Sequence, residues 1–142
     1  MSHLRVVCVS VLVALTWGCG KDGFTTPPSS ANTTASGVAY EVIVDGPAGE
    51  HPGPTSRVRV HYTGWGGDGQ PFDSSVGKDP GPVLRLDEVI DGWTEALQLM
   101  KPGDKWRVWI PAALAYGEQP EDPRSPAGDL VFEIELQQIF RR

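Results

Sequence analysis

The sequence predicts an α+β fold in which an antiparallel β-sheet curls around one short α-helix. Three observations lead to this prediction. Several segments alternate apolar and polar residues, as half-buried strands do, and one segment has helical spacing instead. The 142 residues also include 17 Gly and 13 Pro, which favours many turns over a helical bundle. A chain of this length suits one domain, with some residues left outside it.

The beginning of the chain is typical of an export signal. Arg5 is followed by an apolar run over residues 6–17, shorter than the ~20 residues that a membrane-spanning helix needs but suited to a signal-peptide core. The small residue before Cys19 resembles the bacterial lipoprotein signal, in which the Cys is lipidated after cleavage. We therefore predict a signal peptide over residues 1–18 and lipidation of Cys19. A soluble secreted protein and a retained anchor are the alternatives.

Residues 19–37 are expected to form a flexible tether that begins at Cys19. The segment is rich in Ser, Thr, Gly and Pro and holds one aromatic residue. Such a composition buries too little apolar surface to offset the entropy lost on ordering. The folded domain is expected to follow, over residues 38–142.

Three later segments have the period of two that strands show. In residues 57–63, the side chains of Val58, Val60 and Tyr62 share one face, and polar side chains share the other. The side chains expected inside from residues 105–110 and 130–136 are Trp106, Val108, Ile110, Leu130, Phe132, Ile134 and Leu136. One dry and one wet face predict an antiparallel sheet that is packed on one side only. Basic residues on the wet faces of two strands and acidic residues on the third would help these strands to pair.

The helix is predicted between two of these strands. Trp93, Ala96, Leu97 and Met100 have the i, i+3, i+4, i+7 spacing of one helical face. Asp91 stands at the expected N-cap, and the Lys-Pro-Gly-Asp sequence after Met100 ends the helix. The apolar stripe would therefore lie on the dry face of the sheet.

Composition and spacing argue against several function classes. The net charge of −6 without a basic block makes nucleic-acid binding a poor hypothesis. Cys8 and Cys19 are the two Cys of the chain, so the domain has no disulfide and no thiolate metal site. No His, Asp or Glu cluster has metal-ligand spacing, and the acidic run 118–122 is interpreted as a solvated loop. We expect no metal and no cofactor.

Two further patterns bear on catalytic chemistry. Residues 64–69 match the dinucleotide pattern G-x-G-x-x-G, but no helix follows the glycines. We interpret them as a hairpin turn. A Ser/His/Asp set stays open as an alternative, although no G-x-S-x-G elbow supports it.

Five short blocks carry a more specific signal. They are residues 60–64, 72–75, 89–93, 114–117 and 130–136, which read VHYTG, FDSS, VIDGW, LAYG and LVFEIEL. In this order and spacing, over roughly residues 38–140, the chain resembles the FKBP family of macrolide-binding peptidyl-prolyl cis-trans isomerases. Secreted bacterial members are especially similar.

The resemblance implies a site between the sheet and the helix that takes proline-containing polypeptides. It implies that Trp93 forms the floor of this pocket and that Tyr62, Phe72, Val89, Ile90 and Phe132 form its walls. The Ile90 N–H and the Tyr116 hydroxyl would bond substrate carbonyls, and Asp73 would lie beside the twisted amide. The expected catalytic set is therefore Tyr62, Asp73, Ile90 and Tyr116, and the expected substrate-binding set is Phe72, Val89, Trp93 and Phe132.

The resulting hypothesis is an isomerase for X–Pro bonds of exported proteins, lipid-anchored to the bacterial outer membrane and facing the periplasm or the surface. Two segments depart from the family: residues 118–128 are polar and charged, and residues 82–86 lack the usual Phe. A less apolar rim predicts weaker activity, weaker macrolide binding and a shift toward basic peptides. An FKBP-fold chaperone with weak or lost catalysis is the alternative, and an unrelated small β-rich envelope domain is the third hypothesis.

Overall fold

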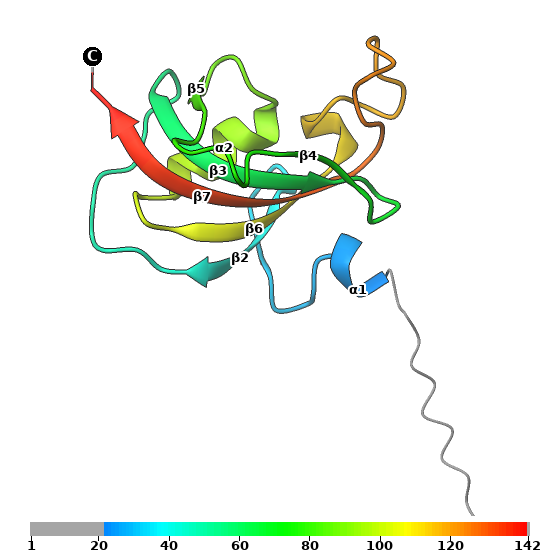
Figure 1. Cartoon of the computed structure of the whole chain (residues 1–142). Helices are drawn as coiled ribbons and strands as arrows, with labels where there is room; N and C mark the ends of the chain where they lie inside the picture. Colours follow the sequence, from blue (N-terminus) through cyan, green and yellow to red (C-terminus); the bar gives the residue numbers. More distant parts are fainter. Residues whose placement is uncertain (1–21, 142) are drawn as a thin grey trace, which may run out of the picture.

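The computed structural model describes residues 22–141, so the expected signal peptide and Cys19 lie outside the described residues. Figure 1 shows the chain in order of its elements. These are α1 Asp22–Thr25, β1 Asn32–Thr33, β2 Ala39–Val44, β3 Arg57–Trp65, β4 Pro71–Ser74, β5 Val83–Arg85, α2 Asp91–Leu99, β6 Lys105–Ile110, the 3₁₀-helix η1 Ala112–Leu114 and β7 Leu130–Phe140.

The strands form one antiparallel sheet in the order β1-β2-β6-β7-β3-β4, and β5 pairs with β3 outside this path. The sheet curves around α2 (Figure 1), which confirms the predicted α+β architecture. The three strands expected from the period of two are β3, β6 and β7. They are neighbours, with Tyr62 opposite Ile134 and Trp106 opposite the same residue on the other side.

The core lies between the concave face of the sheet and α2. The inward side chains predicted from the three strands are buried, Tyr62 only partly, because the pleat sends every second side chain to this face. Trp93, Ala96, Leu97 and Met100 cover them from the helix side. The predicted helical stripe is therefore confirmed.

The start of α2 differs from the sequence prediction by one residue. Ile90 is the N-cap and makes no side-chain cap hydrogen bond, whereas Asp91 is the first helical residue. The Ile90 carbonyl accepts hydrogen bonds from the N–H groups of Trp93 (3.0 Å) and Thr94 (3.2 Å). Asp91 therefore lies in the first turn, where its charge still suits the positive end of the helix dipole.

Residues 24–37 make contacts with the sheet, which differs from the flexible tether that their composition predicts. The Phe24 ring packs edge-on against Trp65 at 4.9 Å, and the Phe24 carbonyl accepts a hydrogen bond from Trp109 Nε1 at 2.9 Å. Strand β1 then pairs with β2. Consequently Trp109 and Val131, which point to the outer face, are buried. Solvent does not reach all of this face, because α1 lies on the side of the sheet away from α2 (Figure 1) and Phe24 packs against Trp109 and Val131.

Charges pair across the outer face as the sequence predicted. Arg107 lies directly opposite Glu133 in the β6–β7 register, and Arg107 Nη2 lies 2.6 Å from Glu133 Oε1. Lys105 lies opposite Glu135 in the same ladder. Such cross-strand pairs each add about 0.2–1 kcal/mol to strand pairing.

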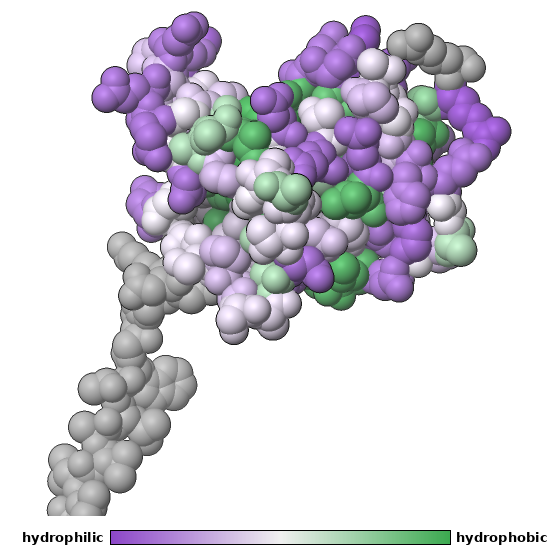
Figure 2. Space-filling view, turned by 180° about the vertical axis from the view of Figure 1, so that it is seen from behind, coloured by the Kyte–Doolittle hydropathy of each residue, from purple (hydrophilic) through white to green (hydrophobic). Residues whose placement is uncertain are grey.

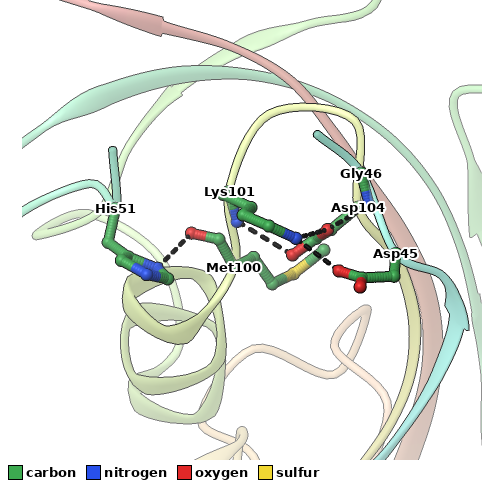
Figure 3. Close-up of polar contacts among 6 residues, drawn as sticks. All are labelled: Asp45, Gly46, His51, Met100, Lys101 and Asp104. Carbon is green, nitrogen blue, oxygen red and sulfur yellow. Dashed lines mark hydrogen bonds and ion pairs between the residues drawn. The ribbon is translucent and has the colours of Figure 1, made fainter. Parts of the chain in front are cut away.

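A buried carboxylate ties the turn after α2 to the segment after β2 (Figure 3). Asp104 accepts hydrogen bonds from the Gly46 N–H (2.7 Å), the Lys101 N–H (3.0 Å) and Lys101 Nζ (2.8 Å). Burial favours the neutral acid, but these bonds outweigh it and lower the pKa of Asp104. Lys101 Nζ also pairs with Asp45, and His51 Nδ1 donates to the Met100 carbonyl at 2.9 Å. The contacts fix the C-terminal end of α2.

Hydrophobic residues reach the surface in separate patches between hydrophilic ones, as the rear view shows (Figure 2). Among residues 22–141, no helix is long and apolar enough to cross a membrane. In the same described part of the chain, no three His, Cys, Asp or Glu side chains are grouped as a metal site requires.

Candidate active site

A cavity of about 380 Å³ opens between the sheet and the beginning of α2. Its walls come from strands β3, β4, β5 and β7, from α2 and from the loops before α2 and after η1. The lining residues are Tyr62, Phe72, Asp73, Leu84, Glu88, Val89, Ile90, Trp93, Tyr116 and Phe132. The structure therefore brings together in one cavity all eight residues that the sequence predicted for the pocket.

The floor of the cavity is aromatic and rigidly packed. Trp93 is 4% exposed and meets Tyr62 edge-on at 5.0 Å and Phe132 edge-on at 5.2 Å. Phe72 stands edge-on to Phe132 at 5.7 Å. Edge-to-face pairs at these distances add about 0.5–1.5 kcal/mol each beyond the burial of apolar area, so the floor is preorganised before a substrate arrives.

Gly64 allows the two phenylalanines to approach the sheet. A Cβ at this position would lie 2.6 Å from Phe132 Cε1 and 2.7 Å from Phe72 Cζ, closer than van der Waals contact permits. Gly64 on β3 pairs with Phe132 on β7 and with Asp73 on β4. The missing side chain therefore leaves the space that the rings occupy.

The carboxylate of Asp73 is held in a fixed orientation at the rim. Asp73 Oδ2 accepts a hydrogen bond from the Tyr62 hydroxyl at 2.6 Å, and Oδ1 accepts one from the Ser74 N–H at 2.8 Å. Burial, and then this bond to Asp73, raise the pKa of the Tyr62 hydroxyl above its ordinary value of 10.0. The phenol therefore stays protonated and continues to donate to Asp73 throughout the physiological range.

Ile90 places a backbone segment against the cavity at the N-terminal end of α2. Its carbonyl is used within the helix, as described above, and its φ of −59° and ψ of 149° turn the chain out of the helix here. The partial positive charge of the α2 N-terminus is therefore next to the cavity. Such a terminus suits the oxygen of a carbonyl group.

Tyr116 closes the cavity from the loop after η1. Its side chain is 44% exposed, so its hydroxyl is accessible to a ligand. The loop is fastened behind it, because the Gly117 N–H donates to the Ala112 carbonyl and the Gly128 N–H donates to the Gly117 carbonyl, both at 2.9 Å. Gly117 has a φ of +82°, which a residue with a side chain rarely adopts.

Two lining residues were not predicted from the sequence. Leu84 lies on β5, opposite Val58 of β3, and Glu88 precedes Val89 in the loop that leads to α2. The alternation of Val83, Leu84 and Arg85 is the available signal for Leu84, but three residues are too few to identify a strand. Residues 118–128, which were expected at the rim, contribute no side chain to the cavity lining within the described residues.

The FKBP-type peptidyl-prolyl cis-trans isomerase family matches residues 48–137 of the chain. The match spans every residue that lines the cavity. The chain belongs to this family.

Individual FKBP relatives agree with this assignment. The FKBP-type 22 kDa peptidyl-prolyl cis-trans isomerase of Escherichia coli K12 is 48% identical over 77% of this chain and 53% of its own length. The outer membrane protein MIP of Legionella longbeachae is 43% identical over 71% of this chain and 43% of its own length. The chain thus spans about half the length of the curated relatives it matches.

Solved FKBP-type structures have the same fold. A peptidyl-prolyl cis-trans isomerase from Pseudomonas syringae pv. tomato superposes with a TM-score of 0.71 at 35% identity, over 85% of this chain and 88% of the other. FkpA of Escherichia coli gives a TM-score of 0.71 at 36% identity, over 84% of this chain and 55% of the other. The resemblance drawn from the five sequence blocks is therefore confirmed.

Proposed function

We propose that this FKBP domain catalyses cis-trans isomerisation of X–Pro bonds in polypeptide clients. One observation carries the proposal: side chains from separate elements converge on a single open cavity with an aromatic floor and polar groups at its rim. A prolyl ring is a compact apolar group, and the cavity of about 380 Å³ has room for it and for the flanking backbone.

The chemistry requires only a change in how the amide is solvated. Rotation about a peptide C–N bond has a barrier of ~18–20 kcal/mol, because the twisted state loses resonance. X–Pro bonds populate both isomers and exchange slowly. The twisted amide is less polar than the planar one, so a dry apolar pocket favours the transition state over the ground state. Lowering the barrier by about 6 kcal/mol would speed exchange by roughly 10⁴-fold.

The polar groups at the rim would orient the bond that rotates. In the proposal, the Ile90 N–H and the Tyr116 hydroxyl donate hydrogen bonds to carbonyl oxygens on either side of the proline. Asp73 lies next to the amide and stabilises the charge distribution of the twisted state. Tyr62 forms a wall with its ring, and its hydroxyl, which already donates to Asp73, positions that carboxylate.

An exchange assay on short X–Pro peptides tests the proposal. We expect the wild-type protein to accelerate exchange, and Asp73→Ala and Tyr116→Phe each to lower kcat/KM by about tenfold, or ~1.4 kcal/mol, without unfolding the domain. Tyr40→Phe is the matched control, because Tyr40 stacks on Trp106 at 4.4 Å and lies outside the cavity. A wild-type rate equal to the uncatalysed rate would refute the proposal.

A chaperone or peptide-binding module with weak or lost catalysis is the second candidate. It is favoured by the polar composition of residues 118–128 and by the absence of Phe from residues 82–86. Under this alternative the peptide binds in the same cavity, and only the rate fails to rise. A macrolide inhibitor would occupy the same cavity, and competition between macrolide and peptide measures its affinity.

We also propose that the mature protein is lipid-anchored at Cys19 in the outer membrane of a bacterial envelope, with the domain facing the periplasm or the surface. The proposal is supported by the export-signal pattern of residues 1–18 and by the relative from Legionella longbeachae that is named an outer membrane protein. Fatty-acid labelling of wild-type and Cys19→Ala cells tests it, and label retained in the variant would contradict it.

A further inference from the structure

A second groove lies beside the candidate active-site cavity, along β3 and β5. Its volume is about 460 Å³, and its lining residues are Arg57, Val83, Leu84, Arg85, Glu88 and Val89. Three of these, Leu84, Glu88 and Val89, also line the first cavity. The two hollows therefore share part of their walls, and a client chain that leaves the first has the second beside it.

The far end of this groove carries two like charges side by side. Arg57 on β3 and Arg85 on β5 are directly opposite in the antiparallel register. Like charges in this position weaken strand pairing, so the fold itself gains nothing from them. The charge of Arg85 is neutralised locally. Its Nε and Nη2 donate hydrogen bonds to Asp87 at 3.0 and 2.6 Å, and Nε also lies 3.8 Å from Glu88 Oε1.

Arg57 has no such compensation. Its guanidinium makes no hydrogen bond or ion pair with another residue of the described chain, residues 22–141. On its other side a further hollow contains Glu50 and Arg141, but these two pair with each other at 2.9 Å. Arg57 is therefore an available cation in the groove that adjoins the candidate active-site cavity.

We propose that Arg57 binds an acidic side chain of the client on one side of the proline. This inference rests on the proposed function and names a substrate class for it. Arg57 precedes Tyr62 by five positions on β3, which corresponds to roughly 17 Å along the strand. An extended client chain covers that distance in about five residues. Fewer residues are needed when the side chain of Arg57 and the acidic side chain of the client extend toward each other. The favoured Asp or Glu is therefore three to five residues from the proline.

The overall charge makes this preference diagnostic. The chain has a net charge of −6, so its long-range field favours basic peptides at every position. A preference for an acid at one position must therefore come from local cations. It also runs opposite to the preference for basic peptides that the sequence of residues 118–128 predicts.

The test uses matched X–Pro peptides that carry Glu, Gln or Lys at one position, two to six residues before or after the proline. Exchange rates are measured by NMR, and binding of the same peptides is measured by calorimetric titration. We expect Glu to exceed Gln in kcat/KM and in affinity by about three- to tenfold at one position within three to five residues. The excess should disappear in high salt and in Arg57→Gln.

Lys105→Gln is the matched control. It removes the same charge from β6, and Lys105 lines neither hollow. We expect its preference for Glu to equal that of the wild type, whereas Arg57→Gln should treat Glu and Gln alike and keep its rate on the Gln peptides.

Two results overturn the inference: equal binding of Glu and Gln at every position, or a Glu preference that survives in Arg57→Gln. Failure of the proposed function is seen separately. In that case the Gln peptides bind without acceleration, and the binding titration still decides whether Arg57 selects an acid.

Discussion

At the scale of single residues, Tyr62 contributes to the cavity in two ways, because it lines the cavity and donates a hydrogen bond at its rim. Tyr62 contributes its ring to the aromatic floor and its hydroxyl to Asp73. The resemblance to the family placed Tyr62 among the catalytic residues. We propose that it acts as a positioning residue, because its hydroxyl already donates a hydrogen bond to the carboxylate.

Removing the hydroxyl of Tyr62 separates these two roles. Tyr62→Phe keeps the ring but removes the bond to Asp73, so we expect kcat/KM to fall about three- to tenfold, roughly 1 kcal/mol. If Tyr62 acts through Asp73, the double variant Tyr62→Phe/Asp73→Ala should be no slower than Asp73→Ala alone. Additive losses in the exchange assay would mean that the hydroxyl contacts the substrate directly.

The same hydroxyl gives a pH prediction. The pKa of Tyr62 is raised in the folded state, so the folded protein keeps the proton more strongly than the unfolded chain does. Its contribution to stability is therefore complete below the ordinary pKa of 10.0 and is lost as the pH rises toward the folded value. Urea unfolding at pH 8 and 11 should show the wild type losing about 1 kcal/mol more than Tyr62→Phe. Equal losses of unfolding free energy in the wild type and in Tyr62→Phe would contradict this prediction.

At the scale of secondary-structure elements, the shape of the cavity depends on how closely β3, β4 and β7 approach. Phe72 of β4 and Phe132 of β7 meet over Gly64 of β3. This arrangement needs both strand registers, because Gly64 is opposite Phe132 on one side and Asp73 on the other.

Gly64→Ala should therefore disturb the floor. The added methyl group would have to displace one of the two rings, so we expect a loss of about 1–3 kcal/mol in stability and roughly tenfold in kcat/KM. Gly67→Ala, in the turn that follows β3, is the control, because the nearest atom to its Cβ is the Asp129 carbonyl oxygen at 3.7 Å. Urea unfolding and the exchange assay measure both effects. Wild-type behaviour of Gly64→Ala would show that the rings move without cost.

At the scale of the whole molecule, the N-terminal segment and the cavity occupy opposite sides of the sheet. Phe24 rests on Trp65, and Arg107 lies over its ring with Cζ 5.1 Å from the ring centre. Helix α2 is on the concave side (Figure 1), and the lining of the cavity includes Trp93 of this helix. Whatever precedes residue 22 is thus joined to the domain on the face away from the proposed active site.

Phe24→Ala should loosen this segment without affecting the site. We expect a loss of about 1–2 kcal/mol in the free energy of unfolding, since Phe24 is partly exposed, and an unchanged kcat/KM. Faster hydrogen exchange at the Trp109 indole N–H, which donates to the Phe24 carbonyl, would show that the contact is lost. Val76→Ala, which shortens a side chain that is 72% exposed, should change neither quantity. Unchanged stability in Phe24→Ala would mean that the segment is not held by this ring.

The sequence by itself determined the strands β3, β6 and β7, the helix α2 and the family. Alternation in residues 57–63, 105–110 and 130–136 and the helical spacing after residue 91 predict faces that the fold uses, because burial on one side imposes these periods on the sequence. Through the resemblance to the family, the five blocks predicted eight of the ten residues that line the cavity, and Leu84 and Glu88 lie outside these blocks.

Only the tertiary structure decided which groups meet across the chain. The bond from Tyr62 to Asp73 follows from the register of β3 and β4, and the position of Arg57 opposite Arg85 follows from the pairing of β3 with β5. The contact of Phe24 with Trp65 joins residues far apart in sequence. A single aromatic residue in a Ser- and Gly-rich segment has no periodicity, so composition predicted a tether where packing made an ordered contact. Local spacing records which face of an element is buried, whereas the partner on that face is set by strand order and register.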